Sequence, residues 1–154
     1  MNSHPLVNVK VKTLEHFKGE LPIYHSLLAS GLDVRAQISQ ALLVAPLDRV
    51  LVSTALCFEI PSAYEIQVRS RSGWAYKKGI SVLNSPGTID ADYRGELKII
   101  LVNLSNQEVS ISPQDRIAQL ILAPVVQINW KMDTNLSATQ RGEKGFGSTG
   151  LSHD

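Results

Sequence analysis

The sequence predicts an all-β fold, an antiparallel sandwich or barrel built from many short strands. Two observations predict it. Apolar residues recur with a period of two over much of the chain, and turn signals such as Pro61-Ser62 and Ser112-Pro113 separate the periodic segments at fairly regular spacing. A chain of 154 residues with 44% apolar residues is expected to form one globular domain.

The expected strands follow one another along the chain. Three valines near the N-terminus alternate with polar residues, and Asp33 begins a short alternating strand. Residues 97–104 and 117–126 are almost continuous apolar runs, which is typical of strands buried on both faces. The apolar positions of the alternating strands are Val7, Val9 and Val11; Val50, Val52, Leu56, Phe58 and Ile60; and Tyr64, Ile66 and Val68.

A short helix is expected between two strands. Ser72 is expected to cap this helix over residues 74–78, and Gly79 to end it. Free amides at a helix N-terminus attract anions, so Arg71 and Ser72 would lie beside a phosphate bound there. The alternative is that Ser72 serves only as a cap.

A hairpin is expected to follow the helix. Ile80 and Val82 alternate as in a strand, residues 85–87 form a turn, and Ile89 resumes the strand, with Asn84 at the tip. Main-chain groups and the Asn84 amide can hydrogen-bond the edge of a planar base. The alternative is that Asn84 is only a turn residue.

Residues 87–96, GTIDADYRGE, contain the densest group of reactive and ligand-binding side chains in the chain. Asp90, Asp92, Tyr93 and Arg94 lie between two expected strands. A structural hairpin has little need for two carboxylates beside an aromatic ring and a guanidinium. This segment therefore indicates a site that binds a sugar, orients a water molecule and tolerates phosphate charge.

Two further polar positions stand out. Asp33 follows Gly31-Leu32, and Gln119 lies on an otherwise apolar strand opened by Arg116. The alternative for Asp33 is a structural role in a turn, and the alternative for Gln119 is hydrogen bonding within the fold.

The chain loses its apolar period near the C-terminus. Residues 1–130 are therefore expected to form the folded domain, and residues 131–154 a flexible glycine-rich tail. Within this tail, RGEKGFGST combines glycines, hydroxyls, the planar fork of Arg141 and the single ring of Phe146, which together suit a nucleotide. The segment is not a Walker loop, because the Gly-Lys-Ser/Thr ending is missing. The alternative is a polar extension without a ligand.

Composition excludes several classes of function. The net charge of +1 gives no broad basic field for nucleic acid, one cysteine forms no internal disulfide, and four scattered histidines lack the spacing of a zinc site. The apolar runs are too short to span a bilayer, and the first residues do not open a signal peptide. We expect a soluble, cytoplasmic protein that binds neither nucleic acid nor membrane. A magnesium ion arriving with a phosphate remains compatible with this composition.

Five segments, in this order, resemble the motifs of the trimeric dUTPase family: ASGLDV, RSGWAYKKGI, GTIDADYRGE, RIAQ and RGEKGFGSTG. They span residues 29–150, nearly the whole chain. The third and fifth segments are long and specific, the second is good, and the first and fourth are weak alone. Their joint occurrence in the correct order makes coincidence improbable.

The resemblance implies an enzyme that cleaves dUTP to dUMP and pyrophosphate by Mg²⁺-assisted attack of water on the α-phosphate. This activity keeps uracil out of DNA and supplies dUMP for dTMP synthesis. The resemblance also implies a homotrimer of jelly-roll-like, distorted β-barrels. Each active site would draw on all three subunits, and the glycine-rich tail of a neighbour would close over it.

The resemblance also implies a role for each site residue. Asp90 is implied as the catalytic residue, which holds the 3′-hydroxyl of the sugar and positions and activates the attacking water. Tyr93 packs under the deoxyribose and leaves no room for a 2′-hydroxyl, and Asp33 takes part in the magnesium environment through water. Uracil is read by Asn84; the phosphates are contacted by Arg71, Ser72, Gly73, Gln119, Arg141, Ser148 and Thr149; Phe146 covers the base; and Thr88, Ile89, Lys98 and Gly147 add substrate contacts.

Two departures from the family pattern and two competing functions remain open. Ser70 stands where the family commonly has proline, which is expected to loosen the phosphate turn, and Trp74 stands where leucine is common, which is expected to change packing between subunits. One alternative is an enzyme like dCTP deaminase, which shares the trimeric architecture but uses a glutamate. The other is a nucleotide-responsive regulatory protein that binds a partner.

Overall fold

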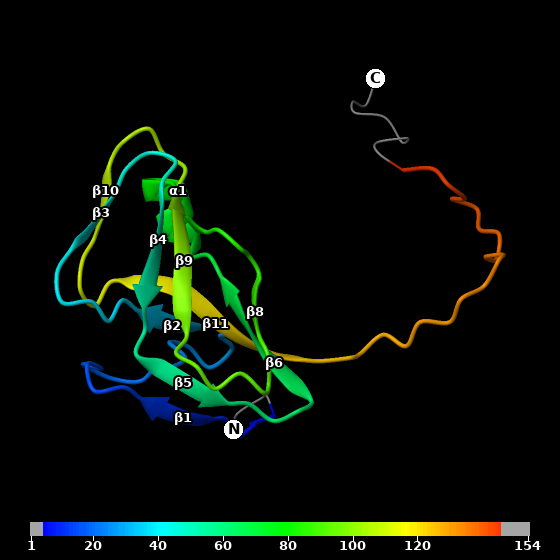
Figure 1. The fold of residues 1–154 in the computed structure, drawn as a ribbon, viewed down its shortest axis with the longest axis horizontal. Helices are drawn as coiled ribbons and strands as arrows, with labels where there is room; N and C mark the ends of the chain where they lie inside the picture. The colour runs from blue at the N-terminus through cyan, green and yellow to red at the C-terminus, as the bar shows by residue number, and fades with distance from the viewer. Residues whose placement is uncertain (1–4, 146–154) are drawn as a thin grey trace.

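The computed structural model describes residues 5–145, and in this part of the chain it confirms an all-β fold with one short helix (Figure 1). Short strands surround one apolar core, and the C-terminal segment leaves this body as an extended arm. The elements, in chain order, are β1 (Lys10–Thr13), β2 (Leu32–Arg35), β3 (Leu42–Val44), β4 (Arg49–Ser53), β5 (Leu56–Glu59), β6 (Tyr64–Arg69), α1 (Ser72–Lys78), β7 (Ile80–Val82), β8 (Gly87–Ile89), β9 (Lys98–Asn103), β10 (Val109–Ile111) and β11 (Arg116–Pro124).

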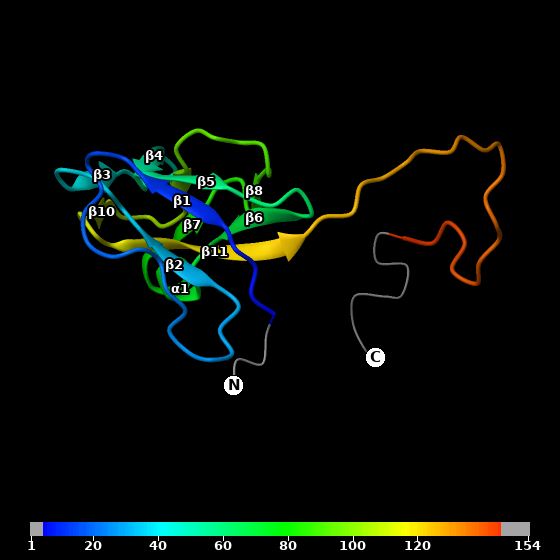
Figure 2. The same cartoon turned by 90° about the horizontal axis from the view of Figure 1, so that it is seen from below.

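The described strands pair into four antiparallel sheets (Figure 2). The largest sheet has the order β2-β11-β6-β8, and a second has the order β4-β9-β7; β1 pairs with β5, and β3 pairs with β10. Strand β11 lies between β2 and β6, so Gln119 stands opposite Asp33 on one side and Arg69 on the other. This register brings three segments that are distant in the sequence side by side.

The core follows from the period of two. On β6, Ile66 and Val68 are buried, and on β9, Ile99 and Leu101 are almost fully shielded from solvent. Burial of each such side chain contributes roughly 1.5–3 kcal/mol relative to exposure. The expected continuous burial of residues 97–104 holds over most of β9, but Lys98 and Leu104 are exposed and Ile100 is half-buried. The expected buried run over residues 117–126 ends with β11, since Val125 and Val126 are exposed.

The expected strand over residues 50–60 is broken by a bend. Its first part, β4, pairs with β9, whereas its second part, β5, pairs with β1. Between them, Ala55 has a φ of 53°, in the left-handed region that disfavours alanine, and it is fully buried. Thr54 Oγ1 donates to the Leu97 carbonyl at 2.6 Å, which ties the bend to the beginning of β9.

The expected hairpin over residues 80–89 is wrong in its pairing. Strand β7 pairs with β9, and β8 pairs with β6, so the two strands belong to different sheets. The Leu83 N–H also donates to the Ile100 carbonyl at 2.9 Å, which extends the contact with β9. The six-residue strands β6 and β9 are longer, more buried partners than two three-residue strands are for each other. Asn84 therefore lies in a connection between sheets.

The expected helix forms, but its N-cap is wrong. The helix begins at Ser72 itself, and the N-cap is Arg71, which makes no side-chain capping bond. The guanidinium of Arg71 is directed instead to Asp33 and to a main-chain carbonyl on β11. The expected end at Gly79 is confirmed: its φ is 67°, and a Cβ there would stand 2.8 Å from Ser105 Cβ.

Strands β3 and β10 are absent from the sequence prediction. Each has three residues, which is too short to show a period, and each is stabilised by pairing with the other across a long stretch of sequence. Beyond β11, residues 125–145 run away from the strands in both views (Figures 1 and 2). Among the described residues, no helix has the length and apolar character needed to cross a membrane.

Candidate active site

A hollow of about 450 Å³ opens over β8, β4 and the beginning of β9, and we call it the Asp90 hollow. Strand β8 ends at Ile89, so Asp90 is the first residue beyond the strand, and it is exposed. Five of the expected site residues share this hollow. The residues that line it are Leu51, Thr88, Ile89, Asp90, Tyr93, Glu96, Leu97 and Lys98.

The loop between β8 and β9 holds Tyr93 in one position. The Tyr93 N–H donates to the Asp90 carbonyl at 3.1 Å, and Tyr93 Oη donates to the Glu96 carbonyl at 3.0 Å. The ring lies against Gly95, where a Cβ would stand 2.6 Å from Tyr93 Cζ. Arg94 braces the same turn by donating to two carbonyls of the loop. The ring is therefore fixed while its face stays partly exposed.

Glu96 is a largely buried carboxylate at the edge of this hollow, with 14% of its side chain exposed. It accepts hydrogen bonds from the Ser53 hydroxyl and, at 3.0 Å, from the Ala55 N–H, and it lies 3.5 Å from Lys98 Nζ. Burial alone raises the pKa of Glu96. The hydrogen bonds from Ser53 and Ala55 and the charge of Lys98 outweigh burial and hold the pKa below its usual value.

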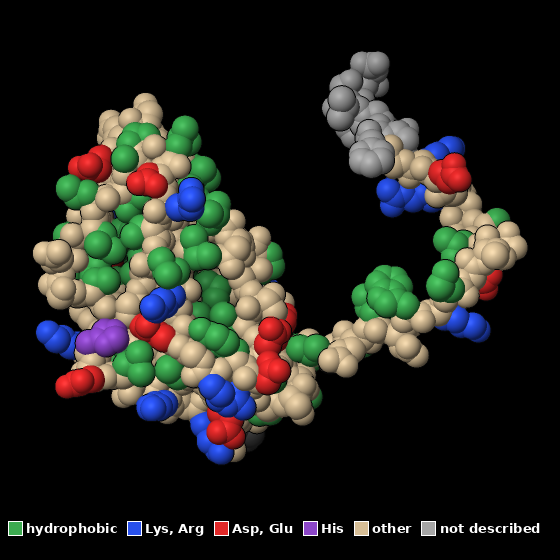
Figure 3. Space-filling view, viewed as in Figure 1, with side chains coloured by type: hydrophobic (Ala, Val, Ile, Leu, Met, Phe, Trp, Pro, Cys, Tyr) green, Lys and Arg blue, Asp and Glu red, His purple; other side chains and the backbone are tan. Residues whose placement is uncertain are grey.

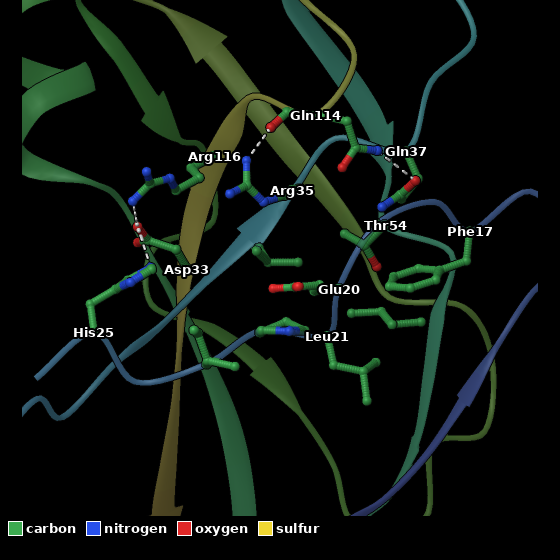
Figure 4. A pocket seen from close by; sticks show the side chains of 15 residues that line it. Phe17, Glu20, Leu21, His25, Asp33, Arg35, Gln37, Thr54, Gln114 and Arg116 are labelled. Carbon is green, nitrogen blue, oxygen red and sulfur yellow. Dashed lines mark hydrogen bonds and ion pairs between the residues drawn. The ribbon is translucent and has the colours of Figure 1, made fainter. Parts of the chain in front are cut away.

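A second charged group joins β2, β11 and the beginning of α1. Asp33 is 9% exposed and accepts hydrogen bonds from Arg71 Nε at 3.0 Å and from Arg116 Nη1 at 3.3 Å. Arg71 Nη1 also donates to the Arg116 carbonyl at 3.0 Å. His25 approaches from the other side, with Nε2 3.9 Å from Asp33 Oδ2 (Figure 4). Asp33 thus orients two guanidinium groups.

Asp33, Arg116 and His25 of this group line a pocket of about 270 Å³, which we call the Asp33 pocket (Figure 4); Arg71 does not line it. Arg35 also borders it and donates to the Gln114 carbonyl at 2.9 Å. In the described part of the chain, the Asp33 pocket and the Asp90 hollow have no lining residue in common. Of the expected site residues that the structure describes, five line the Asp90 hollow and Asp33 alone lines the Asp33 pocket.

Other expected phosphate contacts lie near Arg71. Ser72 and Gly73 form the exposed first turn of α1, directly after it. On β11, Gln119 is half-buried, and a Cβ on Gly31 would stand 3.5 Å from Gln119 Oε1. Glycine at position 31 thus gives the Gln119 amide room beside the strand that carries Asp33.

The remaining expected residues lie apart from both openings. Asn84 is exposed in the connection between β7 and β8, with Nδ2 3.3 Å from where a Cβ on Gly87 would lie. Arg141 is exposed on the C-terminal arm, where its Nε donates to the Lys144 carbonyl at 2.9 Å. The expected tail residues outside the described part of the chain are Phe146, Gly147, Ser148 and Thr149.

Comparison with known proteins decides the family. The family model described as dUTPase matches residues 18–150. The chain belongs to the dUTPase family. A protein of Bdellovibrio bacteriovorus named deoxyuridine 5′-triphosphate nucleotidohydrolase is 58% identical over 142 residues, which cover 92% of this chain and 95% of the relative. A protein of the same name from Fusobacterium nucleatum is 50% identical, covering 92% of this chain and 97% of the relative.

Solved structures of the dUTPase family share the fold. The dUTPase of Staphylococcus bacteriophage 80alpha with dUPNHPP superposes with a TM-score of 0.81 at 25% identity, covering 94% of this chain and 99% of that one. A mutant dUTPase from phage phi11 of S. aureus, described as coordinating a structural Mg(II) ion, gives a TM-score of 0.75 at 19% identity, covering 86% of this chain and 100% of that one. The jelly-roll-like fold is thereby confirmed.

The described residues of this dUTPase fit a magnesium ion that arrives with its nucleotide. Within residues 5–145, no three or more His, Cys, Asp or Glu side chains gather as a metal site would require. Asp33 already pairs with two guanidinium groups, so it suits a contact with magnesium through water better than direct ligation, whereas Asp90 is exposed beside an open hollow. Magnesium keeps several waters and is commonly bound by one or two carboxylates plus substrate phosphates.

The sequence gives little sign of three residues that shape this dUTPase site. Glu96 lies inside the GTIDADYRGE motif, and its position there is its only signal. Arg116 opens the RIAQ segment, but its pairing with Asp33 depends on the register of β2 against β11. Ser53 ends an alternating strand and has no sequence signal, because its partner Glu96 is 43 residues away.

Proposed function

We propose that this chain hydrolyses dUTP to dUMP and pyrophosphate by attack of water on the α-phosphate. The observation that carries the proposal is the Asp90 hollow, where an exposed carboxylate lies beside an aromatic ring that is held in one position. Relatives at 50% and 58% identity bear the name deoxyuridine 5′-triphosphate nucleotidohydrolase. The substrate that we assign to the hollow is therefore the deoxyribose and α-phosphate end of dUTP.

Asp90 and Tyr93 carry the sugar side of the reaction. A carboxylate that accepts a hydrogen bond from the 3′-hydroxyl also orients a water molecule and accepts its proton as the water attacks. The ring of Tyr93 forms the surface under the deoxyribose, so an added 2′-hydroxyl would meet the ring. Thr88, Ile89 and Lys98 complete the wall of the hollow.

Arg71 and the first turn of α1 bind the phosphates in the proposed reaction. Asp33 holds Arg71 in one orientation, so the guanidinium loses little freedom when a phosphate binds. We assign phosphate contacts also to Ser72, Gly73 and Gln119, and we place Asp33 near magnesium through water. Magnesium bound with the nucleotide would neutralise charge on the leaving pyrophosphate.

We propose that the active form is a homotrimer with sites shared between subunits. Asp90 lines the hollow, whereas Arg71, Ser72 and Gly73 do not, so we propose that a second copy brings its phosphate-binding group to Asp90. Apolar side chains also gather over β4 and β9 (Figure 3). A neighbouring copy would bury them and bring its own phosphate group to Asp90. The exposed apolar residues on and beside these strands include Leu43, Leu51, Leu83 and Leu104.

The proposed reaction is tested by measuring pyrophosphate release from dUTP, dCTP, dTTP and UTP in parallel. We expect release from dUTP that exceeds release from each of the other three by at least about 100-fold, because the wrong base or sugar leaves groups of the closed site unpaired or meets the Tyr93 ring. The control is Asp90→Asn, which should bind dUTP but not turn it over. Equal rates with all four nucleotides, or full activity of Asp90→Asn, would overturn the proposal.

A further inference from the structure

We infer that Glu96 is a positioning residue of the proposed dUTP hydrolysis. It anchors the loop between β8 and β9, so that Tyr93 and Asp90 face the sugar in the correct place. The inference rests on the proposed function and adds a residue that lies beside the hollow and acts through the loop that it holds.

The first observation is the number of groups that converge on the Glu96 carboxylate. Oε1 accepts hydrogen bonds from the Ser53 hydroxyl and the Ala55 N–H, and Oε2 lies 3.5 Å from Lys98 Nζ. Ser53 and Ala55 border the bend between β4 and β5, whereas Glu96 ends the loop that carries Asp90. The carboxylate therefore joins the loop to the bend between β4 and β5, where Thr54 and Ala55 are buried.

The second observation is that the same residue holds Tyr93 through its main chain. The Glu96 carbonyl accepts the hydrogen bond from Tyr93 Oη, while its side chain is fixed to the bend. The next residue is fixed as well, because the Leu97 N–H donates to the Leu56 carbonyl at 2.7 Å. Any movement of Glu96 thus moves the carbonyl oxygen that accepts the hydrogen bond from Tyr93 Oη.

The third observation concerns Ala55. Its left-handed backbone is disfavoured for alanine and is kept only where its surroundings hold it. The Ala55 N–H finds its partner in Glu96, and its carbonyl accepts from the Leu14 N–H at 2.9 Å. The carboxylate therefore also stabilises the bend that orients β4 toward β9.

The contacts of His16 favour positioning over a second hydrolytic centre. His16 Nε2 lies 2.9 Å from Ser53 Oγ and 3.7 Å from Glu96 Oε1. In a catalytic triad the acid binds the ring nitrogen that does not face the serine. Here the acid and the serine share one ring nitrogen, and the serine hydroxyl is donated to the acid. This arrangement holds the loop and does not activate Ser53.

The sugar specificity should therefore depend on Glu96. If the ring of Tyr93 shifts, the sugar loses its fixed surface, and room opens for a 2′-hydroxyl. Discrimination of dUTP from UTP should fall together with kcat, whereas a purely structural loss lowers the amount of folded enzyme and leaves this ratio unchanged.

The experiment measures kcat and KM for dUTP and UTP with Glu96→Ala, Glu96→Gln and Glu59→Gln. We expect Glu96→Ala to lower kcat/KM for dUTP by about 100-fold, the size of effect that a small misplacement produces, and to lower the dUTP-to-UTP ratio. Glu96→Gln keeps an oxygen for Ser53 and Ala55 and should recover most of the loss. Glu59 also pairs with a lysine, at 2.8 Å from Lys10 Nζ, but among the described residues its carboxylate makes no hydrogen bond to the loop, and its variant should match the wild type.

The outcomes separate this inference from the proposed function. Wild-type enzyme without dUTP hydrolysis contradicts the proposed function. Active wild type with an unchanged dUTP-to-UTP ratio in Glu96→Ala contradicts the positioning role. If Glu96→Ala does not fold, Ser53→Ala removes one of the hydrogen bonds and should lower the same ratio; an unchanged ratio in that variant contradicts the inference. Ile111→Val, a core change on β10, is the control for loss of stability alone.

Discussion

Gly95 leaves room for the ring of Tyr93. A Cβ at this position would stand 2.6 Å from Tyr93 Cζ, well inside van der Waals contact. We expect Gly95→Ala to displace the ring and to lower kcat/KM for dUTP by about 100-fold, since misplaced contact groups have effects of this size. Steady-state kinetics check this prediction. The control is Asn106→Ala, an exposed position between β9 and β10 that does not line the Asp90 hollow. Equal activity of Gly95→Ala and wild type would contradict the account.

Ser70 lies in the turn between β6 and α1, where phosphate is expected to bind, and it hydrogen-bonds to β7. The sequence predicts a looser turn here, but Ser70 Oγ accepts from the Val82 N–H at 2.9 Å and lies 2.9 Å from Ser81 Oγ. We expect Ser70→Ala to leave the Val82 N–H without this partner and to lower the free energy of unfolding by about 1–3 kcal/mol. Urea unfolding measures the change. Ser62→Ala, in an exposed turn, is the control, and no loss of stability in Ser70→Ala would be the contrary result.

For single residues, the sequence predicts the side chains that would contact a ligand, but it predicts few of the side chains that position them. Asp90 and Tyr93 stand out because a carboxylate and an aromatic ring with a hydroxyl group occur together in one motif. Glu96 and Arg116 act through partners that are 43 and 83 residues away in the sequence. Only the folded register decides whether such a pair exists, so no local pattern identifies the partner of either residue.

The β8–β9 loop should carry an acid-sensitive contribution to stability. The pKa of Glu96 is lowered in the folded chain, so its contribution is complete above the unfolded pKa of about 4.3 and is lost as pH falls through the folded pKa. We expect the free energy of unfolding of wild type to exceed that of Glu96→Gln at about pH 6 and the difference to shrink toward about pH 3. Urea unfolding at a series of pH values measures it. A constant difference would be inconsistent with this role.

The strands also show where an apolar period of two is sufficient to predict a strand from the sequence. Strands β6, β9 and β11 are long enough for the apolar pattern to identify them. Strands β3 and β10 have three residues each and exist because they pair with each other. The pairing of β7 and β8 with different sheets depends on which longer strand offers the better partner, and no turn residue reveals that choice.

Within residues 5–145 the chain has a folded body and an arm with little attachment to it. Residues 125–144 are exposed throughout, so we expect a chain that ends at residue 140 to keep its melting temperature. It loses Arg141 and the glycine-rich motif, and kcat for dUTP should fall by at least about 10-fold, because an open site admits bulk water. Thermal melts and kinetics measure both quantities. A chain that ends at residue 150 keeps the motif and is the control; unchanged kcat after the longer deletion would argue against closure by the tail.

In the proposed homotrimer, the Asp90 hollow of one copy and Arg71 of another copy bind the same dUTP molecule. The most direct measurement is complementation between two inactive variants, Asp90→Asn and Arg71→Ala, unfolded and refolded either separately or together. We predict that each variant alone releases almost no pyrophosphate from dUTP, and that co-refolding restores activity, because mixed assemblies contain sites with both residues intact. Mixed assemblies as inactive as the separate variants would contradict the shared site and with it this account.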